Sequence, residues 1–460
     1  MIANYHDTIA GIATAPGEAG VSIIRLSGES ALEVAEKLFR SKKGTSVAEL
    51  KNRLLTYGWV VKEEKTIDEA LLCVMRGPHS FTAEDVVEIH CHGGSFLTRS
   101  ILELALAHGA RLATPGEFTQ RAFLNGRIDL TQAEATNDLI QAKSTLGLEM
   151  VVNQLKGKLY QKIMDFKEQI SWVLALVNAG IDFPEEDVVF SHLEEIKSKL
   201  SHVAVELKQL IHSADTGIMV REGYKVVLVG EPNVGKSSIM NALLGEARAI
   251  VTKIPGTTRD TIEESCIIEG IPISLTDTAG IRETDDFVEK EGINRSFSAM
   301  TKADLILWVI DMESPTFTMA LPEEVTERKV PVLLVTNKSD LVEAVELTLP
   351  TAIQNYPKIA ISAKKEQEID RLKQKIFQFI SGKVGALAED TMLTNLRQKQ
   401  ASEAALLALQ EATQALEDGM GEEFLTVDLT QTLHALGDIV GETTPDDMLN
   451  RIFSQFCIGK

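Results

Sequence analysis

The chain has 460 residues, a formal net charge of −21 and a hydrophobic fraction of 44%. This length is enough for about three domains with substantial cores. Its four cysteines are too few and too scattered for a disulfide framework, and its acidity disfavours a broad electrostatic grip on nucleic acid. Because the sequence shows neither an apolar run of about 18 residues nor a basic leader, we expect a cytoplasmic protein with reduced thiols and no membrane contact.

The first 120 residues mix short strand-like runs with helical stretches, a pattern typical of an α+β domain. Within them, Glu88, His90 and His92 recur with the period of a strand and so share one face. Alternate strand residues stand about 7 Å apart, which is awkward for convergent metal ligands. We therefore favour a polar strand face or a ligand contact over a metal site.

Arg121 and Arg127 flank an Asn-Gly turn in the segment 113–135. Guanidinium groups presented by a turn could bind a carboxylate ligand bidentately. Solvated arginines beside a turn give the same pattern, and the residues alone favour this second interpretation.

Helical periodicity runs almost unbroken from about residue 129 to 214 and resumes after residue 382. Two helical blocks around a compact α/β segment predict one helical domain interrupted by an inserted domain, since the ends of an inserted domain usually lie close together. Two independent helical domains would show the same periodicity, so that alternative stays open. We place the domains at 1–120, 121–216, 217–382 and 383–460.

The segment 230–237 reads GEPNVGKS and stands between a strand-like run and a helical run. Gly230 and Gly235 permit a tight turn whose backbone N–H groups cradle phosphates. Lys236 would reach the β- and γ-phosphate oxygens, and Ser237 would offer its hydroxyl to Mg²⁺. The strand, loop and helix in this order predict a P-loop for a nucleoside triphosphate.

Two downstream loops predict that the base is guanine. Asn337, Lys338, Ser339 and Asp340 follow an apolar strand. A carboxylate there accepts from the ring N–H and the exocyclic amine of guanine, which adenine does not present. Ser362, Ala363 and Lys364 follow the next short strand and form a second loop beside the base.

The γ-phosphate and its Mg²⁺ have candidate ligands between these loops. Asp277 begins an Asp-Thr-Ala-Gly sequence in which the carboxylate acts on Mg²⁺ and the glycine N–H binds the γ-phosphate. Thr257 and Thr258 supply a switch threonine for the same ion. Five motifs in the right order make a chance match negligible and predict a GTPase.

The predicted GTP contacts outside the two base loops are Asn233, Val234, Gly235, Lys236, Ser237, Ser238, Thr252, Lys253, Ile254, Pro255, Gly256, Thr257, Thr258, Asp277, Thr278, Ala279 and Gly280. The predicted Mg²⁺ ligands are Ser237, Thr258 and Asp277, directly or through water.

Ile281 stands where many small GTPases carry the glutamine that orients the attacking water, so another residue must do this. Asn233, three residues before Lys236, could help to hold a monovalent cation that supplies the charge of an arginine finger. It could equally cap the loop through backbone hydrogen bonds, and the residues alone do not separate the two.

The sequence ends in Cys457, Ile458, Gly459 and Lys460. This tail looks superficially like a prenylation box, but lysine is not a usual final residue and no polybasic stretch precedes it. Cys457 is either an exposed, reactive or ligand-facing thiol or a buried small hydrophobe.

Together these residues resemble the tRNA uridine 5-carboxymethylaminomethyl modification GTPases, the MnmE/TrmE family. The resemblance covers essentially the whole chain. Its carriers are the segments 7–28, 84–94 and 114–135, the five GTPase motifs and the terminal FCIGK. It implies an α+β N-terminal domain that forms a homodimer and binds 5-formyl-tetrahydrofolate or a related folate, a discontinuous α-helical domain, and an inserted Ras-like α/β P-loop GTPase domain.

The resemblance also implies roles for single residues. Arg25, Glu88, Arg127 and Lys460 would line the folate site, although family members often carry lysine where this chain has Arg127. Asn233, Thr252, Ile254 and Thr257 would hold K⁺. Glu289 would orient the hydrolytic water, with Arg259 and Arg282 in the switch regions, and Cys457 would match a functionally required terminal cysteine.

The implied reaction is modification of the wobble uridine of certain tRNAs at C5, together with an FAD-dependent partner, MnmG, that would carry much of the tRNA binding. A folate would supply the one-carbon unit, and GTP hydrolysis would close and reopen paired G domains. The alternative is a regulatory or assembly GTPase that binds a ribosomal or other partner. The GTPase motifs cannot separate these two functions, whereas the N-terminal ligand residues and the CIGK tail favour the first.

Overall fold

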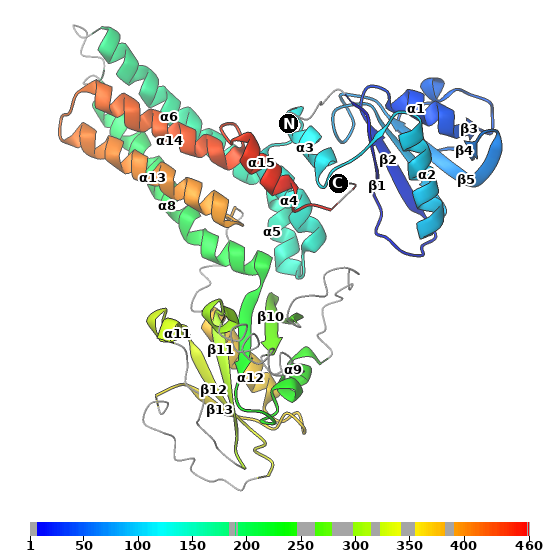
Figure 1. The fold of residues 1–460 in the computed structure, drawn as a ribbon. Coiled ribbons are helices and arrows are strands. Elements are labelled where there is room, and N and C mark those ends of the chain that lie inside the picture. The colour runs from blue at the N-terminus through cyan, green and yellow to red at the C-terminus, as the bar shows by residue number, and fades with distance from the viewer. Residues whose placement is uncertain are drawn as a thin grey trace. The chain divides into compact units, whose positions relative to one another are not determined.

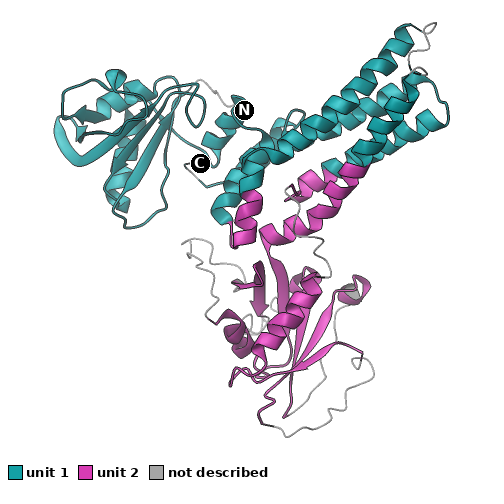
Figure 2. Cartoon of the chain, turned by 180° about the vertical axis from the view of Figure 1, so that it is seen from behind, with its two compact units in different colours: residues 1–141, 152–204, 401–460 teal, residues 142–151, 205–400 magenta. Residues whose placement is uncertain are grey.

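The computed structural model describes residues 7–183, 189, 192–245, 263–277, 298–313, 323–341, 355–381, 391–457 and 459. The chain divides into two compact units, one of residues 1–141, 152–204 and 401–460 and the other of residues 142–151 and 205–400 (Figure 2). The first unit is therefore built from segments on both sides of the second. This confirms the predicted fold class of an α+β N-terminal domain, a discontinuous helical domain and an inserted GTPase domain, while the four finer boundaries stay predictions.

A seven-stranded sheet forms the N-terminal part of the first unit (Figure 1). Its strands, in the order β3-β4-β5-β6-β2-β1-β7, are antiparallel except for the β1–β7 pair. The strands are β1 (Ile9–Ile12), β2 (Ser22–Ser27), β3 (Phe39–Ser41), β4 (Thr56–Lys62), β5 (Lys65–Met75), β6 (Val86–Cys91) and β7 (Arg111–Leu112). The helices α1 (Ala31–Leu38) and α2 (Ser95–Ala107) accompany them, with a short 3₁₀ turn at Val47–Glu49.

The two faces of this sheet differ in chemistry. Strand residues such as Ile24, Val87 and Ile89 are fully buried in one cluster with apolar residues of α1 and α2. Their neighbours along the strands, including Arg25 and Glu88, project from the opposite face because side chains alternate along a strand. The helices thus cover one face and leave a polar site on the other.

Helices make up the rest of the first unit and extend into the second. They are α3 (Glu117–Leu124), α4 (Leu130–Gln141), α5 (Thr145–Leu155), α6 (Lys158–Asp182), α8 (Leu193–Glu222), α13 (Leu396–Glu417), α14 (Glu422–Val440) and α15 (Asp446–Phe453). On α6, buried Ile163, Phe166, Ile170 and Val173 recur at the helical period and form one apolar stripe. Among the described residues no helix has the length and apolar content that crossing a membrane requires.

The second unit contains a six-stranded sheet in the order β13-β12-β11-β8-β10-β9, parallel except for β9. Its strands are β8 (Tyr224–Val229), β9 (Glu263–Ile268), β10 (Ile271–Asp277), β11 (Leu305–Asp311), β12 (Val332–Asn337) and β13 (Lys358–Ala360), and its helices include α9 (Lys236–Leu244), α11 (Glu323–Glu327) and α12 (Ile369–Ser381).

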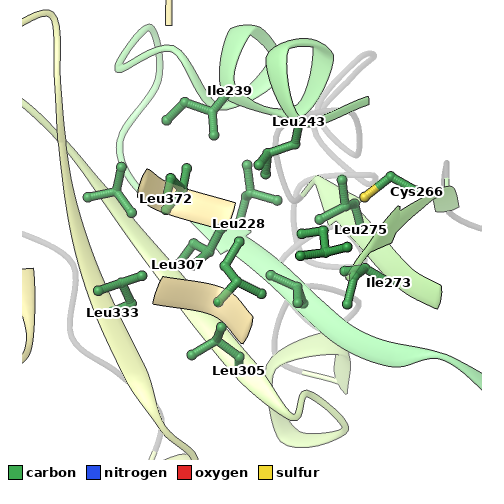
Figure 3. Packing of buried hydrophobic residues seen from close by; sticks show 14 of the residues in the cluster. Leu228, Ile239, Leu243, Cys266, Ile273, Leu275, Leu305, Leu307, Leu333 and Leu372 are labelled. Carbon is green, nitrogen blue, oxygen red and sulfur yellow. The ribbon is translucent and has the colours of Figure 1, made fainter. Parts of the chain in front are cut away.

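The strands of this sheet read as continuous apolar runs because both faces are covered. In β8, Val226 and Leu228 belong to one buried cluster, whereas Val227 and Val229 belong to another. Figure 3 shows the first cluster, in which Leu228, Leu275 and Leu307 of neighbouring strands pack with Ile239 and Leu243 of α9 and Leu372 of α12. This packing fixes α9, and with it the loop that precedes the helix.

In the first unit, a buried ionic network ties α3 to the strands. Arg121 is 1% exposed, and its guanidinium donates to Asp7 Oδ1 at 2.5 Å, Glu84 Oε1 at 3.2 Å and Glu117 Oε1 at 3.1 Å. Arg111 adds a second bond to Glu117, at 2.6 Å. The interpretation of Arg121 as a solvated arginine is therefore wrong, because three carboxylates of the chain itself surround it.

We expect Arg121→Ala to lower the free energy of unfolding of the N-terminal domain by about 3 to 5 kcal/mol, because Glu84 loses its cation and the buried Glu117 keeps only Arg111. Denaturant unfolding followed by the fluorescence of Trp59, with the other two tryptophans replaced by phenylalanine, measures the change. Arg99→Ala is the matched control, since the Arg99–Glu103 pair spans 3.9 Å with side chains 79% and 67% exposed. Equal midpoints for the two variants would contradict this role of Arg121.

Candidate functional site

The loop between β8 and α9 has the backbone of a phosphate-binding loop. Gly230 and Gly235 have φ of +150° and +95°, and Asn233 is exposed in the left-handed region at φ +65°. A Cβ on Gly230 would lie 2.3 Å from the carbonyl oxygen of Val309, so glycine is required for the close approach of the two strands. The strand, loop and helix predicted for this segment are all present.

Lys236 begins α9 and is 5% exposed. Its Nζ donates to the carbonyl oxygens of Gly230, at 2.8 Å, and Glu231, at 2.9 Å. The ammonium group therefore lies over the loop that must hold the phosphates.

The two described candidates for Mg²⁺ ligands lie together. Asp277 at the end of β10 is the register partner of Leu228 in β8, and this brings its carboxylate beside the start of α9. Ser237 Oγ donates to Asp277 Oδ2 at 2.8 Å. A hydroxyl and a carboxylate at this separation suit Mg²⁺, which prefers oxygen ligands.

The side chain of Asn337 joins three loops. Its Nδ2 donates to the carbonyl oxygen of Val234 in the P-loop at 2.8 Å, and its Oδ1 accepts from the backbone N–H of Ala363 at 3.1 Å. The backbone N–H of Ser339 adds a bond to Ile361 O at 3.0 Å. The two base loops and the phosphate loop are thus held in one arrangement.

The carboxylate of Asp340 is oriented by the second base loop. Ser362 Oγ donates to Asp340 Oδ1 at 2.6 Å, and Lys365 Nζ lies 3.4 Å from Oδ2. The hydrogen bond from Ser362, with help from Lys365, holds the pKa of Asp340 below its usual value. The group stays ionised at neutral pH and can only accept hydrogen bonds, as recognition of guanine requires.

A second site lies on the open face of the N-terminal sheet. Arg25 in β2 pairs in register with Glu88 in β6, and the guanidinium binds Glu88 Oε1 through Nε at 2.9 Å and Nη2 at 2.8 Å. The guanidinium also lies over the rings of Phe81 and Phe118, 5.3 and 5.6 Å from their centroids. Arg25 and Glu88 are only 20% and 16% exposed, so little water screens this pair.

The hydrogen bond between His90 and Glu88, followed by the charge of Arg25, keeps the pKa of the Glu88 carboxyl below its usual value. His90 Nε2 lies 3.3 Å from Glu88 Oε2. His92 instead contacts Asp68, with 2.7 Å between its Nδ1 and Asp68 Oδ1. Within the described ranges no group of three or more His, Cys, Asp or Glu could hold a metal ion.

Arg127 reaches the same site from the turn after α3. Its guanidinium lies 5.1 Å from the centroid of the Phe81 ring and donates to the Phe81 carbonyl oxygen. Arg127 is exposed, but its partial desolvation lowers its pKa from the usual value; that value is so high that the charge remains. Arg25 and Arg127 therefore both contact the ring of Phe81.

The C-terminal tail completes this second site. The carbonyl oxygen of Cys457 accepts from the backbone N–H of Gly116 at 3.3 Å, and that of Gly459 accepts from Arg25 Nη1 at 3.4 Å. The thiol-bearing Cys457 is exposed, which decides against the buried alternative. The site thus gathers three of the four predicted folate residues, while Lys460 lies outside the described residues.

The remaining predicted residues of the nucleotide site also lie outside the described ranges. These are Thr252, Lys253, Ile254, Pro255, Gly256, Thr257, Thr258, Arg259, Thr278, Ala279, Gly280, Arg282 and Glu289.

Known proteins resemble this chain along almost its whole length. A family model for the GTP-binding protein TrmE N-terminus matches residues 8–127, and one for the MnmE helical domain matches residues 130–457. A tRNA modification GTPase MnmE from Clostridioides difficile (strain 630) is 46% identical over 459 residues, 99% of this chain and of the relative. The chain belongs to the MnmE/TrmE family.

Other MnmE family members match at similar levels. The tRNA modification GTPase MnmE from Alkaliphilus oremlandii (strain OhILAs) is 45% identical over 460 residues, with 99% of each chain covered. Among solved structures, the G domain of the T. maritima FeoB iron transporter is 28% identical and covers 34% of this chain and 98% of its own, with a TM-score of 0.27. That score is too low to add to the assignment.

Three residues of these sites belong to no sequence motif and were not predicted from the sequence of this MnmE family member. Phe81 lies between two arginines, Lys365 contacts Asp340, and Asp311 contacts Lys338. Only the fold brings each of them to its partner. The sequence gives a single hint for Phe81: it is an aromatic residue four positions before the Asp-Val-Val-Glu segment that contains Glu88.

We expect Gly235→Ala to weaken nucleotide binding by more than about tenfold, because a Cβ there would lie 2.2 Å from Asn337 Nδ2 and displace the amide that joins the loops. Equilibrium titration with a fluorescent GDP derivative measures the affinity. Gly270→Ala is the control, since Gly270 also has positive φ, +82°, but has nothing within 4 Å of the added Cβ. If both variants bound GDP like the parent, Gly235 would have no such role.

Proposed function

We propose that this chain is a GTP-hydrolysing enzyme that, with an FAD-dependent partner, modifies C5 of the wobble uridine of certain tRNAs in the cytoplasm. The observation that carries the proposal is the coexistence of a guanine-nucleotide site with a separate site built from Arg25, Glu88 and Arg127. A GTPase that only switches between partners has no use for the second site. The names of the curated relatives, tRNA modification GTPases, support the same conclusion.

In the nucleotide site, backbone N–H groups between Gly230 and Gly235 bind the phosphates and Lys236 offsets their charge. Ser237 and Asp277, with Thr258, would hold Mg²⁺, which would neutralise the charge that develops during phosphoryl transfer. Asp340 accepts from the guanine edge. Glu289 orients the attacking water, a role that many small GTPases give to a glutamine at the position of Ile281. Arg259 and Arg282 lie in the switch segments.

In the N-terminal site, the ligand is 5-formyl-tetrahydrofolate or a related folate. A folate has a flat ring system with hydrogen-bond donors and a glutamate tail with carboxylates. Glu88 is ionised and accepts from the ring, whereas Arg25, Arg127 and Lys460 offer cations for the carboxylates. Phe81 and Phe118 provide flat apolar surface, and the exposed Cys457 lies at the tail that borders this site.

The N-terminal domain is also proposed to form the homodimer. Tyr57 and Leu71, register partners in β4 and β5, lie in the same row as His90 on the sheet face that α1 and α2 leave open. Leu71 is 37% exposed there, so a second copy would bury apolar surface. Sedimentation equilibrium gives the mass of the assembly.

The partners follow from charge. A chain with net charge −21 makes a poor general surface for tRNA, so the FAD-dependent protein carries much of the tRNA binding. GTP hydrolysis in the paired G domains gates the modification through closure and reopening.

Deletion of the gene is expected to remove the C5 substituent from wobble uridines while leaving other tRNA modifications in place. Mass spectrometry of tRNA nucleosides from cells with and without the protein measures this. Complementation with Gly270→Ala, which leaves both sites intact, restores the modified nucleoside, whereas Gly235→Ala does not. Unchanged wobble uridines in the deletion strain would favour the regulatory GTPase instead.

Potassium is proposed as the charge-supplying cation, held by Asn233 with Thr252, Ile254 and Thr257. We expect GTP hydrolysis to be at least about tenfold faster in K⁺ than in Na⁺ at equal ionic strength. Asn233→Gly, which suits the left-handed backbone at this position and removes only the amide, should abolish the difference between the two ions. Equal rates for the parent protein in both salts would refute the potassium site.

Arg25→Ala should weaken binding of 5-formyl-tetrahydrofolate by roughly tenfold or more, because it removes a partly buried cation and leaves Glu88 with only His90 as a partner. GDP affinity should stay the same. Isothermal titration calorimetry measures the affinity for both ligands. Arg99→Ala is the control, because it also removes a positive charge from the same domain. Folate affinity equal to that of the parent would exclude Arg25 from the site.

A further inference from the structure

Lys338, the second residue of the first base loop, is bound to a residue outside every GTPase motif. Its Nζ donates to Asp311 Oδ2 at 2.5 Å. Asp311 ends β11 and is the register partner of Asn337 at the end of β12. The backbone N–H of Met312 also donates to Asn337 O at 3.0 Å, so a backbone hydrogen bond joins the two strand ends beside this ion pair.

Asp311 is itself held firmly. Its side chain is 13% exposed, its Oδ1 accepts from the backbone N–H of Glu313 at 2.9 Å, and its Oδ2 takes the ammonium of Lys338. A carboxylate with both oxygens engaged and little contact with water has few alternative positions. A partly buried ion pair of this kind is stronger than an exposed one, because water screens it less.

Without Asp311, the side chain of Lys338 would be less restrained than those of Asn337 and Asp340. Asn337 is anchored to Val234 and Ala363, and Asp340 is anchored to Ser362, whereas Lys338 is 32% exposed and has a left-handed backbone with φ +64°. A free lysine side chain samples many rotamers, and ordering it opposes ligand binding. The bond to Asp311, which also raises the pKa of Lys338, fixes both ends of its four-carbon stem.

We propose that Asp311 is a positioning residue for the guanine base, which it serves by holding the ammonium of Lys338 so that the stem forms one side of the base site. The proposal rests on the proposed binding of GTP to the second unit. Asp311 itself touches no part of the nucleotide in this arrangement. Its contribution is pre-organisation of Lys338, and it acts alike on GDP and GTP because their bases are identical.

The test is equilibrium binding of GDP to the full-length protein and to Asp311→Asn, by competition with a fluorescent GDP derivative. Asparagine has the size of aspartate and can still accept from the N–H of Glu313, but it lacks the charge that holds Lys338. We expect GDP to bind roughly three- to tenfold more weakly. Glu222→Gln is the matched control, because it removes the same charge from an exposed pair with Lys225, 3.5 Å apart, and should leave affinity unchanged.

Inosine diphosphate separates positioning of Lys338 from general damage to the base loops. It lacks the exocyclic amine of guanine and so loses one bond to Asp340. If Asp311 acts through Lys338 alone, Asp311→Asn weakens GDP and inosine diphosphate by the same factor and preserves their ratio. A fall in that ratio would mean that Asp340 has moved, which overturns the proposal.

A double-mutant cycle with Lys338→Met, which keeps an unbranched apolar stem and removes the ammonium, tests the coupling. In the Lys338→Met background, Asp311→Asn should not change GDP affinity further. The proposal would be overturned if the losses of GDP affinity from the two substitutions added up. It would also be overturned if the single Asp311→Asn variant bound GDP as tightly as the parent. If Asp311→Asn failed to fold by thermal melting, Lys338→Met alone would serve, and unchanged GDP affinity of that variant would overturn it. Failure of the parent protein to bind GDP would instead refute the proposed function.

Discussion

The nucleotide site depends on the two hydrogen bonds of the Asn337 side-chain amide. One end of the amide fastens the P-loop through Val234, and the other fastens the second base loop through Ala363. Such a bridge is possible only because β8 and β12 are parallel strands whose carboxyl ends lie at the same edge of the sheet. It also requires that Gly235 carry no side chain, since any Cβ would occupy the place of the amide nitrogen. Phosphate binding and base recognition are thereby coupled through a single residue.

Much of this site could be predicted from the sequence, because its parts are local. A P-loop needs its glycines at fixed spacing for backbone reasons that hold in any fold, and the base loops follow strands that the apolar pattern marks. The N-terminal site is different, since it depends on sheet register. Arg25 and Glu88 are 63 residues apart in the chain and meet because β2 and β6 pair in one register and no other. Only resemblance to a family, and no pattern of the residues themselves, could place them together.

The two arginines around the Asn-Gly turn illustrate the limit of local patterns. Arg121 and Arg127 are six residues apart in similar surroundings, yet one is buried among Asp7, Glu84 and Glu117 and the other is exposed beside Phe81. The difference arises because α3 presents Arg121 to the strands, whereas Arg127 lies beyond the end of the helix. Asp311 could not be found from sequence for the same reason: its partner, Lys338, lies in a loop after a neighbouring strand.

The docking of the tail at Cys457 and Gly459 sets an order of events during synthesis. Arg25 leaves the ribosome 434 residues before Gly459, whose carbonyl it binds. A Cβ on Gly459 would lie 2.0 Å from the carbonyl oxygen of Ile12, so the tail packs against the first strand of the sheet. The N-terminal sheet is therefore synthesised long before the tail residue that binds Arg25, because the helices and the inserted domain are made in between. A chain that stops before Cys457 would keep the nucleotide site but would lose the two tail carbonyls that accept hydrogen bonds from Gly116 and Arg25.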